Sequence, residues 1–82
     1  DTTSEERQLD DREMLNVIVA LAKQLTPKQQ TAFVLRDLES LPVEEVCEIS
    51  GLNTAQVKSN LYYARINIRE GLTRYYRETK KC

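Results

Sequence analysis

Apolar residues recur at intervals of three and four along most of this chain, which is the spacing of residues on one face of an α-helix. The first such series predicts a helix over residues 9–25 and comprises Met14, Ile18, Leu21 and Leu25. Thr26 then precedes Pro27 and stands three residues before Gln29, an order that provides a capping hydroxyl, a proline at the first helical position and a capping-box partner. We therefore expect a second helix to begin at Pro27 and to end near Ser40.

The second half of the chain predicts a short helix, a tight turn and a long helix. Pro42 can open the short helix, whose predicted buried stripe is Val43, Val46, Cys47 and Ile49. Gly51 suits the left-handed end of that helix, and Asn53, three residues before Gln56, can cap the next one. The long helix carries an apolar series consisting of Val57, Leu61, Ala64, Ile68, Leu72 and Tyr75. Since no segment shows the alternation of a strand, we predict an all-α four-helix bundle that ends in a helix-turn-helix with a long recognition helix.

Length and composition indicate one small domain. The chain has 82 residues, of which 40% are hydrophobic and 30% charged, and it contains no apolar run long enough to cross a bilayer. We expect residues 1–8 to be a linker or disordered, residues 9–78 to form the domain and residues 79–82 to be a tail. Cys47 falls in an apolar helix position and is interpreted as a packing residue, and with Cys82 it suggests two separate thiols in a reducing, cytoplasmic setting. We expect no membrane partner.

The net charge of −1 conceals a strong gradient along the chain. Residues 53–82 hold seven basic residues against two acidic ones, while residues 1–22 hold six acidic residues against two basic ones. A polyanion would be attracted to the C-terminal block and repelled by the N-terminal one. The ordinary alternative is a solvated helix face.

The stretch from Leu25 to Leu72 carries a family resemblance, and its motifs lie in residues 25–65, "LTPKQQTAFVLRDLESLPVEEVCEISGLNTAQVKSNLYYAR". Its ordered combination of Leu-x-Pro, a Leu-Arg pair, Glu-Glu, Gly-Leu, Val-Lys-Ser and Ala-Arg resembles region four of bacterial RNA polymerase sigma factors, the C-terminal DNA-binding domain, and especially the extracytoplasmic-function group. Region two of that family is not in this sequence. The chain therefore looks like a fragment of a longer protein.

The resemblance implies sequence-specific recognition of the upstream, or −35, promoter element by the fourth helix lying in the major groove. It also implies two protein partners, the β-subunit flap of the polymerase core and an anti-sigma protein. Two alternatives stay open. One is the output domain of a response-regulator-type transcription factor, and the other is a protein-interaction module that no longer binds DNA.

The candidate DNA-binding residues all lie on the fourth helix. At about 100° per residue, Lys58, Arg65 and Arg69 share one flank, where they can contact phosphates. Ser59 and Asn60 are short polar groups near the helix N-terminus, suited either to base edges or to capping. Tyr62 and Tyr63 point away from the apolar stripe and can pack on a thymine methyl or a sugar, or be partly buried against a neighbour.

Three further expectations concern positions where this sequence differs from the family, an outward-facing isoleucine, and residue types that the sequence lacks. Family members often carry basic residues at the positions of Asn60 and Tyr63, so we expect weak and only moderately salt-dependent DNA binding. Ile66 lies on the outward face beside two tyrosines and suggests a small apolar partner surface. The chain has no histidine and no glycine-rich phosphate loop, so we predict no enzymatic activity, cofactor, metal or small-molecule substrate.

Overall fold

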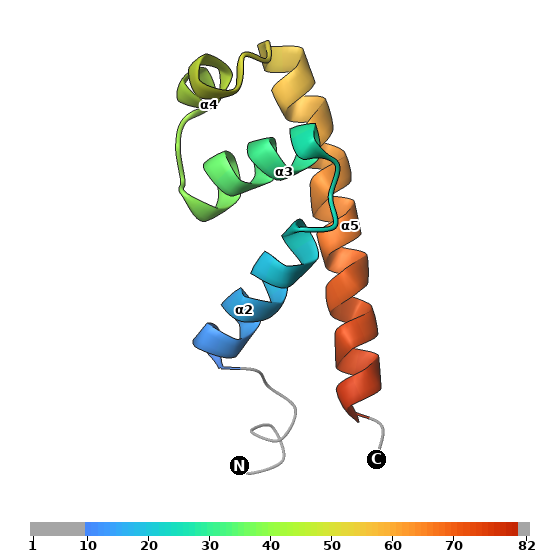
Figure 1. The fold of residues 1–82 in the computed structure, drawn as a ribbon. Coiled ribbons are helices and arrows are strands. Elements are labelled where there is room, and N and C mark those ends of the chain that lie inside the picture. Colours follow the sequence, from blue (N-terminus) through green and yellow to red (C-terminus); the bar gives the residue numbers. More distant parts are fainter. Residues whose placement is uncertain (1–9, 81–82) are drawn as a thin grey trace.

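The computed structural model describes residues 10–80, with side chains to residue 78, and every regular element in this range is helical (Figure 1). The elements are α2 (Asp11–Ala22), α3 (Pro27–Phe33), the π-helical turn η1 (Val34–Leu38) that continues α3, α4 (Val43–Ser50) and α5 (Thr54–Lys80). The predicted all-α fold is confirmed. The predicted linker over residues 1–8 and residues 81–82 of the predicted tail lie outside the described residues. Within the described range, no helix is both long and apolar enough to span a membrane.

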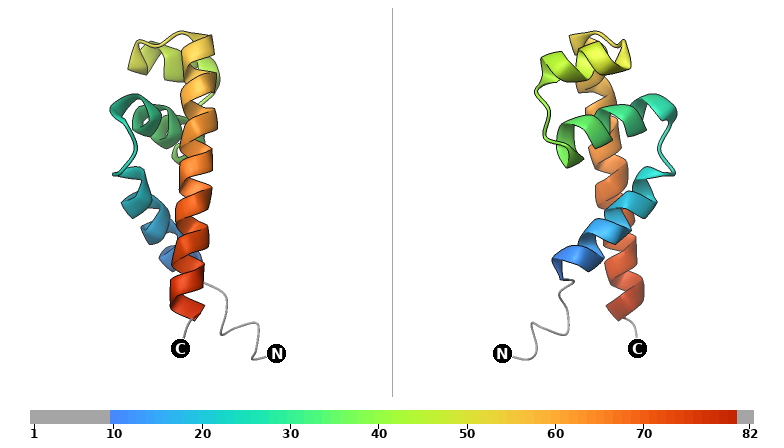
Figure 2. Two further views of the ribbon diagram at one scale, coloured as in Figure 1. Left: turned by 90° about the vertical axis from the view of Figure 1, so that its right-hand side faces the viewer. Right: turned by 60° about the vertical axis from the view of Figure 1, so that its left-hand side comes forward.

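Helix α5 is the element against which the other helices pack. Its 27 residues extend over about 40 Å at 1.5 Å per residue. Helix α2 lies beside its C-terminal half, α3 crosses its middle, and α4 packs near its N-terminal end, as the two further views show (Figure 2). Helices α4 and α5 and the short turn between them form the predicted helix-turn-helix.

The ends of the helices follow the signals in the sequence. Thr26 and Gln29 form a reciprocal capping box, in which the Gln29 backbone N–H donates to Thr26 Oγ1 at 3.3 Å and the Thr26 N–H to Gln29 Oε1 at 3.4 Å. Asn53 and Gln56 repeat the arrangement at the start of α5, with distances of 2.8 and 3.0 Å. Gly51 ends α4 with φ 79°, a left-handed conformation that glycine adopts without steric cost. These three predictions are confirmed.

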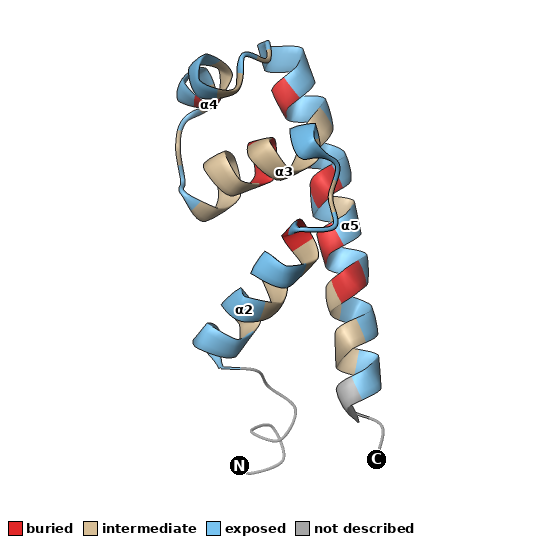
Figure 3. Ribbon diagram, in the orientation of Figure 1, coloured by how far each residue is buried: buried red, intermediate tan, exposed pale blue. Residues whose placement is uncertain are grey.

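The core consists of two clusters of buried residues along α5 (Figure 3). The first cluster packs α4 against α3 and the start of α5, and we call it the reading cluster. Its buried members are Ala32, Val46, Val57 and Leu61. The second, which we call the α2 cluster, fastens α2 and α3 to the rest of α5, and its buried members are Ala22, Phe33, Ala64 and Ile68. The predicted apolar face of α5 is therefore buried through Ile68. Leu72 and Tyr75, its last two members, are only partly buried.

Several predicted boundaries need correction. Helix α2 ends at Ala22 and not at residue 25, because the chain must leave the helix to reach the extended conformation of Thr26. The second helix, predicted to end near Ser40, passes into η1 and ends at Leu38, and Ser40 has φ 62°. Pro42 stands before α4 with ψ 157° and so caps the helix, while Val43 is its first residue.

The predicted buried stripe of α4 is wrong at Ile49, a residue that is 61% exposed. Val43, Val46 and Cys47 do pack in or against the reading cluster. At about 100° per residue, Ile49 lies beyond the Val46 edge of that stripe, on the side away from Cys47. Because α4 contacts the core only through the face that carries Val43, Val46 and Cys47, Ile49 stays in solvent.

Candidate nucleic-acid interface

The N-terminal half of α5 presents a largely polar face to solvent. Val57, Leu61 and Ala64 are buried toward the bundle, while Lys58, Ser59, Tyr62 and Tyr63 are exposed. The helix is held at this end by α4 through Val46 and Val57, both fully buried. The helix-turn-helix therefore supports the first turns of α5 from one side and leaves the other side open.

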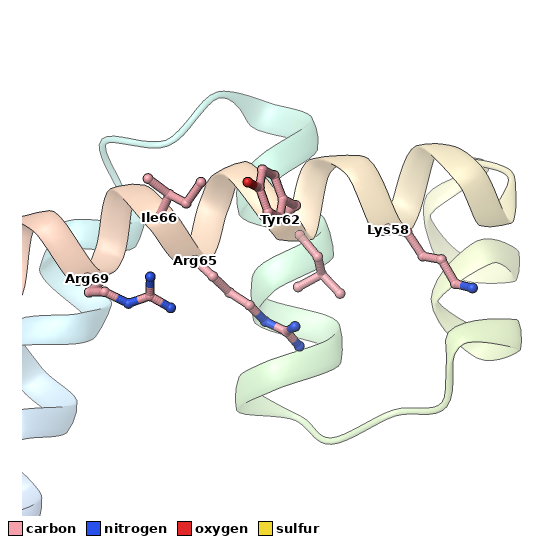
Figure 4. A pocket seen from close by; sticks show the side chains of 6 residues that line it. Lys58, Tyr62, Arg65, Ile66 and Arg69 are labelled. Atoms are coloured by element: carbon pink, nitrogen blue, oxygen red, sulfur yellow. The ribbon is translucent and has the colours of Figure 1, made fainter.

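A shallow hollow of about 470 Å³ runs along this part of α5, and we call it the α5 hollow. It is lined by Lys58, Leu61, Tyr62, Arg65, Ile66 and Arg69 (Figure 4). The predicted flank of Lys58, Arg65 and Arg69 is thus brought together in one place. Ile66 contributes to the same surface but is only partly exposed.

Arg65 is engaged by a residue from another helix. Its Nε donates to Asp37 Oδ2 at 2.8 Å and its Nη2 to Asp37 Oδ1 at 2.7 Å, a bidentate pair between α5 and η1. The hydrogen bond to Asp37, together with the carboxylate charge, raises the pKa of Arg65 above its ordinary value. The Arg65 side chain is 49% exposed, so the pair lies at the rim of the bundle.

Asn60 and Ser59 differ in their surroundings. The Asn60 side-chain amide donates to the Gln56 carbonyl at 2.8 Å, a local bond within α5 that occupies one of its donors. Ser59 is exposed. Of the two short polar residues, Ser59 is the one that can turn toward a base without giving up a described hydrogen bond.

Tyr62 and Tyr63 form an exposed aromatic pair. Their rings are 5.1 Å apart at an interplanar angle of 82°, an edge-to-face arrangement. The residues are 61% and 53% exposed, so the prediction that they point away from the core is confirmed. The pair is therefore accessible to a partner.

The residue that sequence reasoning missed is Asp37. It stands 28 residues before Arg65, and no local pattern connects the two positions. Their contact depends on how α3 and η1 cross α5. The candidate interface is therefore built from α5 with one acidic contribution from η1.

The fold is that of a helix-turn-helix protein, and the start of its last helix is exposed on one side. The model of the family "Sigma-70, region 4" matches residues 15–68, more than half of the chain. The chain belongs to this family, whose domain recognises the −35 promoter element in transcription initiation and has no catalytic role. No curated protein and no solved structure matches the chain. The family match selects the sigma-factor interpretation over the response-regulator alternative.

Proposed function

We propose that this domain binds the −35 element through the exposed side of α5 between residues 58 and 69. Ser59 and Tyr62 contact base edges or a thymine methyl near the helix N-terminus, and Tyr63 packs beside them on a sugar. Lys58 and Arg69 contact phosphates from the rim of the α5 hollow, and Asn60 contributes when its bond to Gln56 opens. The observation that supports this proposal best is the exposure of Lys58, Ser59, Tyr62 and Tyr63 on a helix whose opposite side is buried.

A binding experiment with the 82-residue chain tests the assignment. A duplex is first selected by the chain from a pool with randomised sequence, and a shuffled duplex of equal composition serves as the non-specific probe. Tyr62→Ala should weaken binding to the selected duplex more than to the shuffled one, because base contacts carry specificity. Lys58→Ala should weaken both, and Lys23→Ala, which removes an exposed lysine at the end of α2, should change neither. Equal behaviour of the Lys58 and Lys23 variants would refute the interface.

Family membership supports a second contact, with the polymerase core, and we propose that the flap of the β subunit holds this domain at the promoter. The thin positive charge of α5 is consistent with this, since a domain with few phosphate contacts needs a second source of affinity. We also propose that the chain is part of a cytoplasmic sigma factor of the extracytoplasmic-function group. A pull-down of the chain with the isolated flap tests the contact, and the coding sequence ahead of residue 1 tests the assignment by the presence of region two.

The exposed tyrosines favour an additional protein partner on the same face. Tyr62, Tyr63 and Ile66 form a small apolar surface that an anti-sigma protein can cover. Ile66→Lys should weaken such a partner and should leave DNA binding in place. Unchanged affinity of a purified anti-sigma protein for this variant would remove the proposal.

A further inference from the structure

The contact between Arg65 and Asp37 uses one edge of the guanidinium and leaves another edge open. A guanidinium has five N–H donors in a rigid planar fork. Asp37 accepts from Nε and from one N–H of Nη2. Of the three remaining N–H groups, one of Nη1 and the second of Nη2 point the same way and form the end of the fork. Arg65 lines the α5 hollow between Lys58 and Arg69 (Figure 4), and its side chain is 49% exposed despite the contact with Asp37.

Asp37 is fixed more firmly than a surface carboxylate usually is. It belongs to the π-helical turn η1, and such turns are uncommon and occur frequently at functional sites. Its neighbour Arg36 donates from Nη1 to the Leu41 carbonyl at 3.0 Å, which ties η1 to the loop before α4. Residues on both sides of Asp37, Leu35 and Leu38, pack against the two core clusters. The backbone that carries Asp37 is therefore anchored on both sides, and the carboxylate itself contacts Arg65.

The pair also changes what Arg65 offers electrostatically. A carboxylate at 2.7 Å offsets the charge of the guanidinium for any distant phosphate. A free arginine would add about 0.9 to the slope of log affinity against log salt, because it would release one counterion. An arginine that is already paired adds much less and acts instead as an oriented hydrogen-bond donor.

We propose that Asp37 is a positioning residue for DNA binding, which holds the Arg65 guanidinium so that the free end of its fork is presented to a pair of acceptor atoms on the DNA. The acceptors are either guanine O6 and N7 or two phosphate oxygens, both of which accept this bidentate geometry. The inference rests on the proposed DNA interface on α5. It adds a residue from outside the helix-turn-helix to the determinants of binding.

The test uses affinity and its salt dependence, measured by fluorescence anisotropy with the selected and the shuffled duplex. Arg65→Ala should weaken binding to the selected duplex several-fold and change the salt slope by well under 0.9. Arg65→Lys should lose nearly as much affinity, since an ammonium keeps the charge but lacks the planar fork. Asp37→Asn should make the slope steeper by up to about 0.9, because it frees the charge of Arg65. When Arg65 is already replaced by Ala, Asp37→Asn should increase the slope by less than half as much, because no Arg65 charge is left to free.

Two results would overturn the proposal. The first is full retention of affinity in Arg65→Lys together with an unchanged slope in Asp37→Asn, which would make Arg65 an ordinary cation. The second is a lowered unfolding midpoint in all the variants with unaltered binding of the folded protein, which would make the pair a purely structural link between η1 and α5. A fall in the ratio of selected to shuffled affinity in Arg65→Ala identifies guanine as the acceptor, and an unchanged ratio identifies phosphate.

The Lys58→Ala variant separates failure of this inference from failure of the proposed function. If Lys58→Ala weakens binding, Arg65→Ala does not, and Asp37→Asn leaves the salt slope unchanged, only the positioning role is refuted. If the chain selects no sequence and Lys58→Ala has no effect, the interface on α5 is refuted and the positioning role falls with it.

Discussion

The two core clusters along α5 are built differently although they share the helix. The reading cluster joins α3, α4 and α5, and its buried members are all aliphatic. The α2 cluster joins α2, α3 and α5, includes the single phenylalanine, and is surrounded by a larger number of half-buried leucines. Helix α2 also leaves Leu15 and Val19 exposed at 49% and 40%. The difference indicates that α4 is held by a core that it shares with α3 and α5, whereas α2 is attached along one side of α5.

The largest expected effect comes from removing the aromatic ring of the α2 cluster. Phe33 is 5% exposed, and Phe33→Ala should lower the free energy of unfolding by about 3–5 kcal/mol, the usual cost of deleting a buried phenylalanine. Urea unfolding followed by circular dichroism measures this. Since small domains are stable by only about 5–15 kcal/mol, the variant should be close to its unfolding transition at room temperature.

A matched substitution in the reading cluster sharpens the comparison. Leu61→Ala should cost about 2–5 kcal/mol, and Phe33→Leu, which keeps an apolar side chain at its site, clearly less than Phe33→Ala. If Phe33→Ala costs no more than Phe33→Leu, the ring is not the central packing element of the α2 cluster.

The two left-handed residues on either side of α4 form the next pair. Ser40 has φ 62° and Gly51 φ 79°. A side chain costs about 1 kcal/mol in this conformation, so Ser40→Gly should raise the free energy of unfolding by about that amount or less. Gly51→Ala should lower it by about 1 kcal/mol through backbone strain alone, because nothing lies within 4 Å of the added methyl group. Thermal unfolding of both variants measures the effects, and a change of the same sign in the two would contradict the explanation.

The Ser40 corner shows where sequence reasoning succeeded and where it could not. Capping pairs such as Thr26 with Gln29, and the apolar series of α5, are local signals, and they placed the helices correctly. The second helix ends at Leu38, two residues before the predicted end near Ser40, and its π-helical last turn has no local signature in the sequence. Asp37 was missed for the same reason, since its contact to Arg65 exists only after α3 crosses α5. Local patterns placed the elements, and only the tertiary crossing showed which polar groups meet.

The contact between Gly71 and Leu21, beside the α2 cluster, should have a smaller effect on the free energy of unfolding. Gly71 is buried, and a Cβ there would lie 2.6 and 2.9 Å from the two methyl groups of Leu21. Gly71→Ala gains about 0.8–1 kcal/mol of helix propensity but forces the end of the Leu21 side chain to move. In the Leu21→Ala background the obstacle is absent, so Gly71→Ala should be more stabilising there than in the wild-type chain. A double-mutant cycle of urea unfolding measures the difference in the free energy of unfolding. Equal effects in both backgrounds would show that the Leu21 side chain moves aside without loss of stability.

The smallest expected effect compares the two ends of α5 in their response to salt. Lys58 lies about 6 Å along the helix from Thr54 and Arg77 about 35 Å, whereas the major groove is only about 12 Å wide. Lys58→Gln should therefore reduce the salt slope of DNA affinity by about 0.9, and Arg77→Gln by less than half of that. The wild-type slope should itself be shallow, since few cations on α5 reach phosphates. A steep wild-type slope, or an equal reduction by the two variants, would contradict this prediction. Either result would mean that DNA also contacts the C-terminal half of α5, because counterions are released only where cations contact phosphates.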